Sequence, residues 1–239
     1  DEYGMADFQG ESLAFDEYFG ENKPKIIKFP FTPTPGGYFI KEWIFILIIL
    51  WWWKKTLLLG YSPVRISLAG GGTDMPEYYE KYGGNVVSTG IDKFTYVLIK
   101  SRDDNLFQAF STNFEIHQKK TSFKKLKSKA GTEIAVSVIK NLNFKNGADF
   151  VIASDVQPGS GLGASSSLTV NFINTISKLQ KKKFSKKQIA EKAFFIERNK
   201  LLHPIGKQDD YVASYGGLNY IKFSKNRTTV TPINLTKPK

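Results

Sequence analysis

The chain has 239 residues, of which 41% are hydrophobic and 23% charged, and this balance excludes a disordered chain and predicts a buried core. Cysteine is absent and no signal sequence is visible at the start, so we expect a reducing, cytoplasmic setting. The net charge of +12 would attract polyanions, but the lysines cluster with few aromatic residues between them, which indicates solvated surface and no nucleic-acid partner.

The first 55 residues differ in composition from the rest. Residues 1–42 are acidic and punctuated by proline and glycine, and an apolar run of eleven residues follows at 43–53. A helix that crosses a membrane needs about 20 residues, so we expect no membrane-spanning segment. Because Lys54 and Lys55 follow three tryptophans, a peripheral membrane anchor stays open as an alternative. We interpret 43–55 as an apolar junction between two regions.

From Thr56 onward, short strand and helix patterns predict an α+β domain over 56–239. Strands are predicted at 57–68, at 84–101 with a break at Asp92 and Lys93, at 107–116, 148–154 and 219–223. Helices are predicted at 76–82, 131–140, 165–180, 185–198 and 208–214. Strands come first and helices later, which favours two layers over regular βαβ alternation.

A glycine- and serine-rich loop lies between the strand at 148–154 and the helix at 165–180. It reads Pro158-Gly159-Ser160-Gly161-Leu162-Gly163-Ala164-Ser165-Ser166-Ser167. Glycines let backbone amides approach an anion, and the start of the helix adds unpaired N–H groups and the positive end of its dipole. A serine hydroxyl there can reach a metal ion that is bound to the phosphate. The loop therefore predicts a cradle for the phosphates of ATP.

Other interpretations of this loop stay open. Gly159, Gly161 and Ala164 also match the G-x-G-x-x-A dinucleotide fingerprint, which would predict an NAD-dependent oxidoreductase. However, residues 155–158 separate the strand from the glycines, and no acid follows about 20 residues later. A P-loop is excluded because no Lys-Ser/Thr pair follows a glycine at the required position. The purely structural interpretation is a glycine-rich turn with serine helix caps.

Two further segments combine glycines with acids. The first, 62–74, runs from Ser62-Pro63-Val64-Arg65 into three glycines and the pair Thr73-Asp74; the second, 196–211, holds Glu197, Gly206-Lys207-Gln208-Asp209 and Tyr211. Alone, the first is most simply a surface turn with an aspartate helix cap, and the second a helix-loop-helix. His203 shows no triad or metal partners in the sequence, so we expect no histidine-based nucleophilic mechanism.

Together the three segments resemble the N-terminal domain of the GHMP kinase superfamily over about 56–223. Within it, Pro63-x-Arg65-Ile66-Ser67, Ala69-Gly70-Gly71-Gly72-Thr73-Asp74 and Gly206-Lys207-Gln208-Asp209-x-Tyr211 are most similar to the D-glycero-D-manno-heptose 7-phosphate kinases. The resemblance implies a two-layer, ribosomal-protein-like β-α fold. It also implies that a C-terminal ferredoxin-like domain is largely missing from this chain.

The resemblance further implies roles for particular residues. Those that would hold ATP are Pro158, Gly159, Ser160, Gly161, Leu162, Gly163, Ala164, Ser165 and Ser166. Ser165 and Glu197 would complete an Mg²⁺ site, a ligand set that suits an ion which keeps mostly water and phosphate oxygens. Asp209 would be the catalytic base, with its pKa lowered by Arg65, which would also neutralise the transferred phosphoryl group.

The substrate would be a small-molecule sugar phosphate, phosphorylated at its anomeric hydroxyl. Gly72, Thr73 and Asp74 would bind the sugar, and Lys207 and Arg198 are weaker candidates for a phosphate already on it. We allow for a homodimer. The alternative function is a non-catalytic nucleotide-binding or peripheral membrane-associated fragment. Residues 1–42 resemble the C-terminal end of a macrocin O-methyltransferase-type SAM-dependent methyltransferase, without its glycine loop, and we interpret them as a remnant.

Overall fold

A computed structural model describes residues 26–28, 37–39, 56–111, 116–128 and 131–234. The chain divides into two compact units, Asp1–Trp53 and Lys54–Lys239. In the first, β1 (Ile26–Lys28) pairs antiparallel with β2 (Gly37–Phe39), with Ile26 opposite Phe39. The methyltransferase-like remnant falls largely, and the apolar junction wholly, outside the described residues, so both stay predictions.

The second unit is built on a seven-stranded sheet. Its strands are β3 (Leu57–Ala69), β4 (Gly84–Ser101), β5 (Leu106–Ser111), β6 (Ile116–Ser122), β7 (Ala148–Ser154), β8 (Leu218–Phe223) and β9 (Thr228–Pro232). They lie in the order β6-β5-β7-β4-β8-β9, and β3 also pairs with β4. Only the β5–β7 pair is parallel among the described strands.

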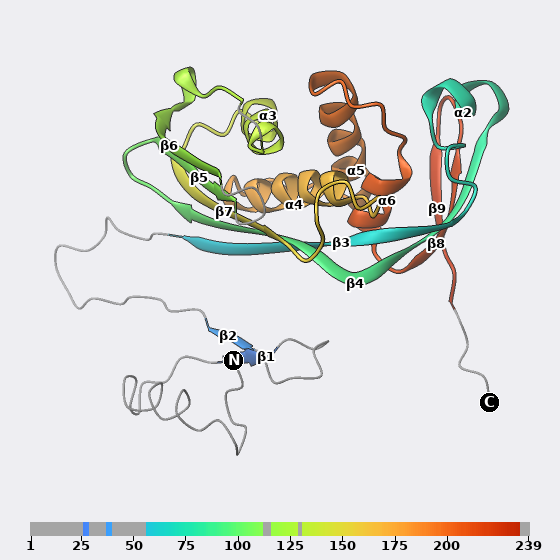
Figure 1. Cartoon of the computed structure of the whole chain (residues 1–239), viewed down its shortest axis with the longest axis horizontal. Helices are drawn as coiled ribbons and strands as arrows, with labels where there is room; N and C mark the ends of the chain where they lie inside the picture. Colours follow the sequence, from blue (N-terminus) through green and yellow to red (C-terminus); the bar gives the residue numbers. More distant parts are fainter. Residues whose placement is uncertain (1–25, 29–36, 40–55, 112–115, 129–130, 235–239) are drawn as a thin grey trace, which may run out of the picture. The chain divides into compact units, whose positions relative to one another are not determined.

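Helices form the second layer. They are α2 (Pro76–Tyr82), α3 (Glu133–Asn141), α4 (Ala164–Leu179), α5 (Lys186–Phe195) and α6 (Gln208–Tyr215), with a short 3₁₀ turn η1 (Phe123–Lys125) and a π-helical turn η2 (Ile196–Lys200). Helices α3 to α6 lie on one face of the sheet (Figure 1). The predicted two-layer fold is confirmed. None of the helices in the described ranges is long and apolar enough to cross a membrane.

The hydrophobic core lies between the sheet and these helices. Fully buried side chains from β4, β7 and α4 meet there: Val97, Ile99, Phe150, Phe172 and Ile176. In β4 the buried residues alternate with exposed or half-buried ones, as expected for a sheet that is covered on one face. The core thus uses the period-2 pattern from which the strands were predicted.

The predicted break in β4 at Asp92 and Lys93 is wrong, because the strand continues from Gly84 to Ser101. Its first part, 84–89, pairs with β8, and its last part, 95–101, pairs with β7. The two exposed polar residues lie where the strand changes partner, and β3 opposite them has an irregular register between Pro63 and Arg65. Where the strand changes partner, its side chains no longer alternate between buried and exposed positions. The sequence pattern there therefore resembled a turn.

Other boundaries also differ from prediction. The strand predicted at 107–116 is β5, which ends at Ser111, and Ile116 already begins β6. The helix predicted at 185–198 ends as an α-helix at Phe195 and continues as the π-helical turn. Strands β6 and β9 were not predicted, because both are rich in polar residues and lie at the two ends of the strand order among the described strands. The start of α5 follows from a capping box between Ser185 and Gln188.

A buried polar network attaches α4 to the two longest strands. The Asn171 amide donates to the carbonyls of Gly60 (3.0 Å) and Thr95 (2.9 Å), and the Ser167 hydroxyl donates to the Ser62 carbonyl (2.8 Å). Helix and strand approach so closely at Gly60 that an added Cβ would lie 2.0 Å from the Thr175 hydroxyl. These contacts fix the helix whose first turn follows the glycine-rich loop.

We expect Asn171→Ala to lower the free energy of unfolding by about 1–3 kcal/mol, because a buried and a partly buried carbonyl would each lose a donor. Urea denaturation measures the change. Asn141→Ala, at the exposed end of α3, is the matched control and should have little effect. Equal stability losses in the two variants would show that the network does not anchor α4.

Candidate functional site

The glycine-rich loop exposes its backbone at two of its three glycines. The φ angles of Gly159, Gly161 and Gly163 are 78°, 74° and 74°. They lie in the left-handed region of the backbone, which residues other than glycine rarely adopt. A Cβ at Gly159 or Gly161 would meet nothing within 4 Å, so the main chain there is open to a ligand. A Cβ at Gly163 would instead lie 2.9 Å from the Asp209 Oδ2 atom. Nothing in the sequence indicated this contact.

The loop leads directly into the first turn of α4. Gly163 is the residue before the helix, and within the described chain no side chain caps this end. The first backbone bond of the helix runs from the Ser167 amide to the Gly163 carbonyl (3.0 Å), which leaves the earlier amides of the turn for another acceptor. Ser166 is buried, whereas the Ser165 hydroxyl donates to the Glu197 carboxylate. The turn has the features of an anion site.

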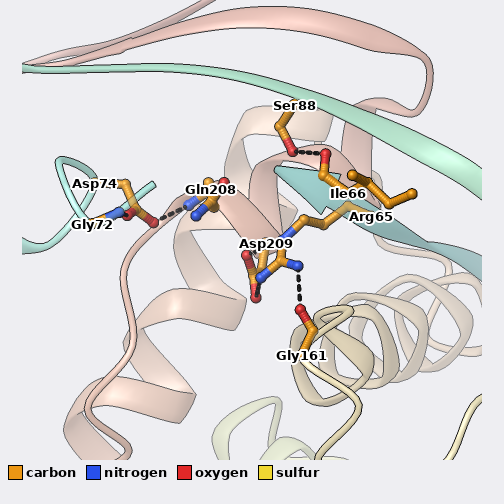
Figure 2. A network of polar contacts seen from close by, with 8 residues as sticks. All are labelled: Arg65, Ile66, Gly72, Asp74, Ser88, Gly161, Gln208 and Asp209. Atoms are coloured by element: carbon orange, nitrogen blue, oxygen red, sulfur yellow. Dashed lines mark hydrogen bonds and ion pairs between the residues drawn. The ribbon is translucent and has the colours of Figure 1, made fainter. Parts of the chain in front are cut away.

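Arg65 connects this loop to α6. Its Nε and Nη2 atoms donate to the two carboxylate oxygens of Asp209 at 2.6 and 2.7 Å, and its Nη1 donates to the Gly161 carbonyl at 2.6 Å (Figure 2). Its main-chain amide donates to the Leu162 carbonyl at 2.9 Å. One residue therefore binds the loop twice and the predicted base twice. Residues 96 and 144 positions away in sequence meet at a single guanidinium.

The pKa of Asp209 is raised above the usual range of an aspartate. Burial is the largest cause, and the charge and hydrogen bonds of Arg65 act in the opposite direction without overcoming it. Arg65 does lower the pKa of Asp209, as expected. The net shift of this pKa is nevertheless upward, because burial raises it more than Arg65 lowers it. The cause is desolvation, which disfavours the ionised carboxylate. A raised pKa lies closer to neutral pH, where it makes the carboxylate a more effective proton acceptor.

Asp74 connects the three-glycine turn to the start of α6. Its carboxylate is buried and accepts from the Gly72 amide (3.1 Å) and the Gln208 amide (2.9 Å), and Figure 2 shows it facing the first turn of α6. The residue before α2 is Met75, so Asp74 does not cap the helix next to it in sequence. It instead accepts from the first amide of a helix 134 residues away.

Thr73 stabilises the same turn. Its hydroxyl donates to the Gly70 carbonyl (2.7 Å) and accepts from the Asn85 amide (3.0 Å). The Thr73 side chain, which was predicted to bind sugar, therefore attaches the turn to β4. Gly72, with φ of 88° and open space where a Cβ would lie, keeps its backbone accessible.

Glu197 lies in the π-helical turn that follows α5, and it is fully buried. One carboxylate oxygen accepts from Ser165, and Oε1 has no hydrogen-bond partner among the described residues. Irregular helical turns of this kind often occur at functional sites. Over the described ranges no group of three or more His, Cys, Asp or Glu side chains forms a metal site.

His203 has a partner that the sequence did not reveal. Its Nδ1 lies 3.7 Å from Glu197 Oε2, and the interaction with this carboxylate raises the pKa of the histidine, against the opposing effect of burial. The two residues are brought together by the turn, in which the His203 amide also donates to the Glu197 carbonyl (3.0 Å).

Sequence reasoning missed Asp210. It is fully buried in α6, and neither carboxylate oxygen has a donor among the described residues. Burial, followed by the negative charge of Glu197, raises its pKa well above the usual range. The protonated form can donate toward Glu197, which the ionised form cannot. The available signal was the adjacent pair Asp209-Asp210 in the first turn of the predicted helix at 208–214.

Comparisons with known proteins come from both sequence and structure. The family described as "GHMP kinases N terminal domain" matches residues 123–217. The D-glycero-alpha-D-manno-heptose 7-phosphate kinase of Campylobacter jejuni is 31% identical over 186 residues, which cover 73% of this chain and 53% of that protein. The L-fucokinase/L-fucose-1-P guanylyltransferase of Bacteroides fragilis is 29% identical over 189 residues, which cover 68% of this chain and 19% of that protein.

A solved structure agrees with these matches. The crystal structure of a D-glycero-D-manno-heptose 1-phosphate kinase from Bacteroides thetaiotaomicron superposes with a TM-score of 0.71 at 25% identity, covering 76% of this chain and 61% of that chain. The predicted family resemblance is confirmed. The chain spans about half the length of the Campylobacter jejuni relative, 53%.

We expect Gly163→Ala to destabilise the protein more than Gly159→Ala does. Both residues have a left-handed backbone, so each alanine costs about 1–2 kcal/mol, but only the Cβ at 163 collides with Asp209. Urea denaturation and titration with ATP would show a larger loss of stability and weaker binding for Gly163→Ala. The same loss in both variants would contradict the close packing of the loop on Asp209.

We expect Asp210→Asn to stabilise the protein at pH 7–8, because asparagine removes the cost of taking up a proton on folding, which is about 1.4 kcal/mol for each unit by which the pKa is raised. The raised pKa means that the folded state holds a proton which the unfolded state releases above its ordinary pKa. Stability from Asp210 is therefore full at low pH and is lost as the pH rises through the folded-state pKa, so the gain should shrink towards pH 4. Thermal unfolding at several pH values measures it.

The control for this prediction is Asp92→Asn, which removes an exposed charge on β4. It should leave the pH dependence of stability as in the parent chain. A stability gain for Asp210→Asn that did not depend on pH would show that the carboxyl group is already ionised in the folded state.

Proposed function

We propose that this chain, whose residues 123–217 belong to the GHMP kinase N-terminal domain family, carries the ATP-binding and proton-accepting half of a sugar kinase. The observation that carries the proposal is the Arg65 guanidinium, which holds the Asp209 carboxylate and the Gly161 carbonyl together. A phosphate-binding loop beside a carboxylate and a cation is the arrangement that phosphoryl transfer to a hydroxyl requires.

The loop and the start of α4 fit the phosphates of ATP. Gly159 and Gly161 present open backbone, and the first turn of the 16-residue helix has free amides and the positive end of its dipole. We propose that ATP contacts the predicted residues 158–166. Ser166 is buried, which favours its backbone amide over its hydroxyl as the group that reaches a phosphate.

Ser165 and Glu197 fit a magnesium ion. A hydroxyl and a carboxylate already in contact, next to a phosphate loop, give the hard oxygen donors that Mg²⁺ prefers, and Glu197 Oε1 has no partner among the described residues. When bound, the ion would neutralise charge on the phosphates. Glu197 is held for this role by its burial and by the Ser165 and His203 contacts.

We propose that Asp209 accepts the proton of the attacking sugar hydroxyl. Its raised pKa makes it a better acceptor than an ordinary aspartate, and Arg65 keeps both carboxylate oxygens at fixed positions. Because Arg65 is also bonded to the loop, its charge lies where negative charge gathers during transfer. Gly72, Thr73 and Asp74 would orient the sugar from the neighbouring turn.

We propose a heptose 7-phosphate or a related sugar as the substrate, phosphorylated at the anomeric hydroxyl. Support comes from the 31% identity to the Campylobacter jejuni enzyme, whose name specifies a heptose 7-phosphate. The two other relatives are named for a heptose 1-phosphate and for fucose, so the shared substrate class is a sugar or sugar phosphate.

We expect Asp209→Asn to lower sugar-dependent ADP formation by about 10²–10⁴-fold, the usual contribution of a general base, with ATP binding little changed. A coupled assay with a panel of sugars and sugar phosphates measures turnover, and calorimetry measures ATP binding. Glu80→Gln, an exposed carboxylate on α2, is the control and should keep full turnover.

Three outcomes would contradict the proposal in different ways. Full turnover in Asp209→Asn would show that another group accepts the proton. Binding of ATP without turnover on any sugar would favour a non-catalytic nucleotide-binding module. Tighter binding of NAD than of ATP would favour the dinucleotide interpretation of the loop.

A further inference from the structure

Lys207 precedes the first turn of α6 and is bound to α5. Its ammonium lies 3.0 and 2.9 Å from the two carboxylate oxygens of Glu191. The lysine side chain is 14% exposed and the glutamate 37% exposed, so the pair is partly shielded from solvent. Shielding strengthens such a pair relative to one on the surface.

Two aromatic rings, one from α2 and one from α5, complete the surroundings of this ammonium. It lies 5.1 Å from the ring centre of Phe194 and 5.7 Å from that of Tyr79, and both are cation–π distances. The Tyr211 hydroxyl donates to Glu191 Oε1 at 2.5 Å. Lys207 therefore joins α2 through Tyr79, α5 through Glu191 and Phe194, and α6 by its own position.

The backbone of Lys207 is held at the same time. Its amide donates to the Asp74 carbonyl (3.2 Å), and the next amide, that of Gln208, donates to the Asp74 carboxylate (2.9 Å). The Tyr211 amide donates to the Lys207 carbonyl (3.2 Å), which begins the helix. Asp209, whose carboxylate meets Arg65, follows two residues later in the same helical turn.

We propose that Lys207 is a positioning residue for Asp209 that acts through Glu191, and that it does not bind a phosphate on the substrate. The inference rests on the proposed kinase function. The donors of the ammonium are directed at a carboxylate, and its sides face two rings, which leaves little of it for a substrate. A lysine recruited for a phosphate would need to leave all three partners.

The other candidate for a substrate phosphate is also engaged. The Arg198 guanidinium pairs with Glu77 of α2 and donates to the Ile205 carbonyl (3.2 Å). It thereby stabilises the loop between η2 and α6 from the other side. Lys207 and Arg198 were the two candidates for binding a phosphate on the substrate. Both are instead bound to other residues of the protein and hold the segment 196–211 in place.

The test compares Lys207→Met, Glu191→Gln and the double variant. Methionine keeps an unbranched apolar stem against Phe194 and Tyr79 but removes the charge. We expect each single variant to lower kcat by about 10–100-fold, the effect of a misplacement near 1 Å, and the double variant to be no worse than either. The apparent KM for ATP should be unchanged, and the loss should be equal for a phosphorylated sugar and its unphosphorylated counterpart. Lys207→Arg, which keeps the charge, should restore most of the activity.

A phosphate-binding role would give a different result. Lys207→Met would then raise KM for the phosphorylated sugar alone, Glu191→Gln would not reproduce the effect, and the proposal would be overturned. Lys192→Met is the control, since this neighbouring lysine lies over Phe184 (5.0 Å) and should leave kcat unchanged.

Hydrogen exchange separates this inference from the proposed function. The amides of residues 208–211 should exchange faster in Lys207→Met and Glu191→Gln than in the parent chain and in Lys192→Met. If the parent phosphorylates no sugar, the kinase proposal fails, and faster exchange would still support the anchoring of α6. Unchanged exchange in both variants would overturn the anchoring whatever the activity.

Discussion

The Arg65 guanidinium is the interaction on which the rest of the site depends. It donates to Asp209 with two nitrogens and to the Gly161 carbonyl with the third, while its own amide binds the Leu162 carbonyl. A planar cation with a fixed fork of donors can bind a carboxylate and a carbonyl at once, and the point charge of a lysine cannot. The distance between the loop and Asp209 is therefore set by the dimensions of one side chain.

Charge balance is the second constraint. The negative charges of Glu197 and Asp209 raise the pKa of Asp210, and that of Glu197 also raises the pKa of Asp209, whereas the charge of Arg65 lowers it. His203 lies beside Glu197. Burying several carboxylates is unfavourable unless they are paired or protonated. The protein meets this constraint with an arginine at one acid and with a raised pKa at another. An arrangement that costs stability in this way is common where binding a cation or moving a proton is the function.

The surrounding elements place these groups through contacts far from the chemistry. Asn171 fixes α4 to the sheet, Lys207 fixes α6 to α5, and Asp74 connects the glycine turn to α6. Each contact uses a buried or partly buried polar group, which has geometric requirements that apolar packing lacks. The site is consequently held by a framework of directional bonds around a hydrophobic core.

The sequence by itself determined the two-layer fold, most element boundaries in 56–223 and the family resemblance, because strand alternation, helix periodicity and glycine loops are local patterns. It could not show that β4 is continuous, that Asp74 serves a helix 134 residues away, or that Lys207 is committed to Glu191. Nor could it give the net pKa shift of Asp209, since burial outweighs the charge of Arg65. Only the tertiary structure decides such matters, because desolvation and long-range pairing depend on which distant residues the fold brings together.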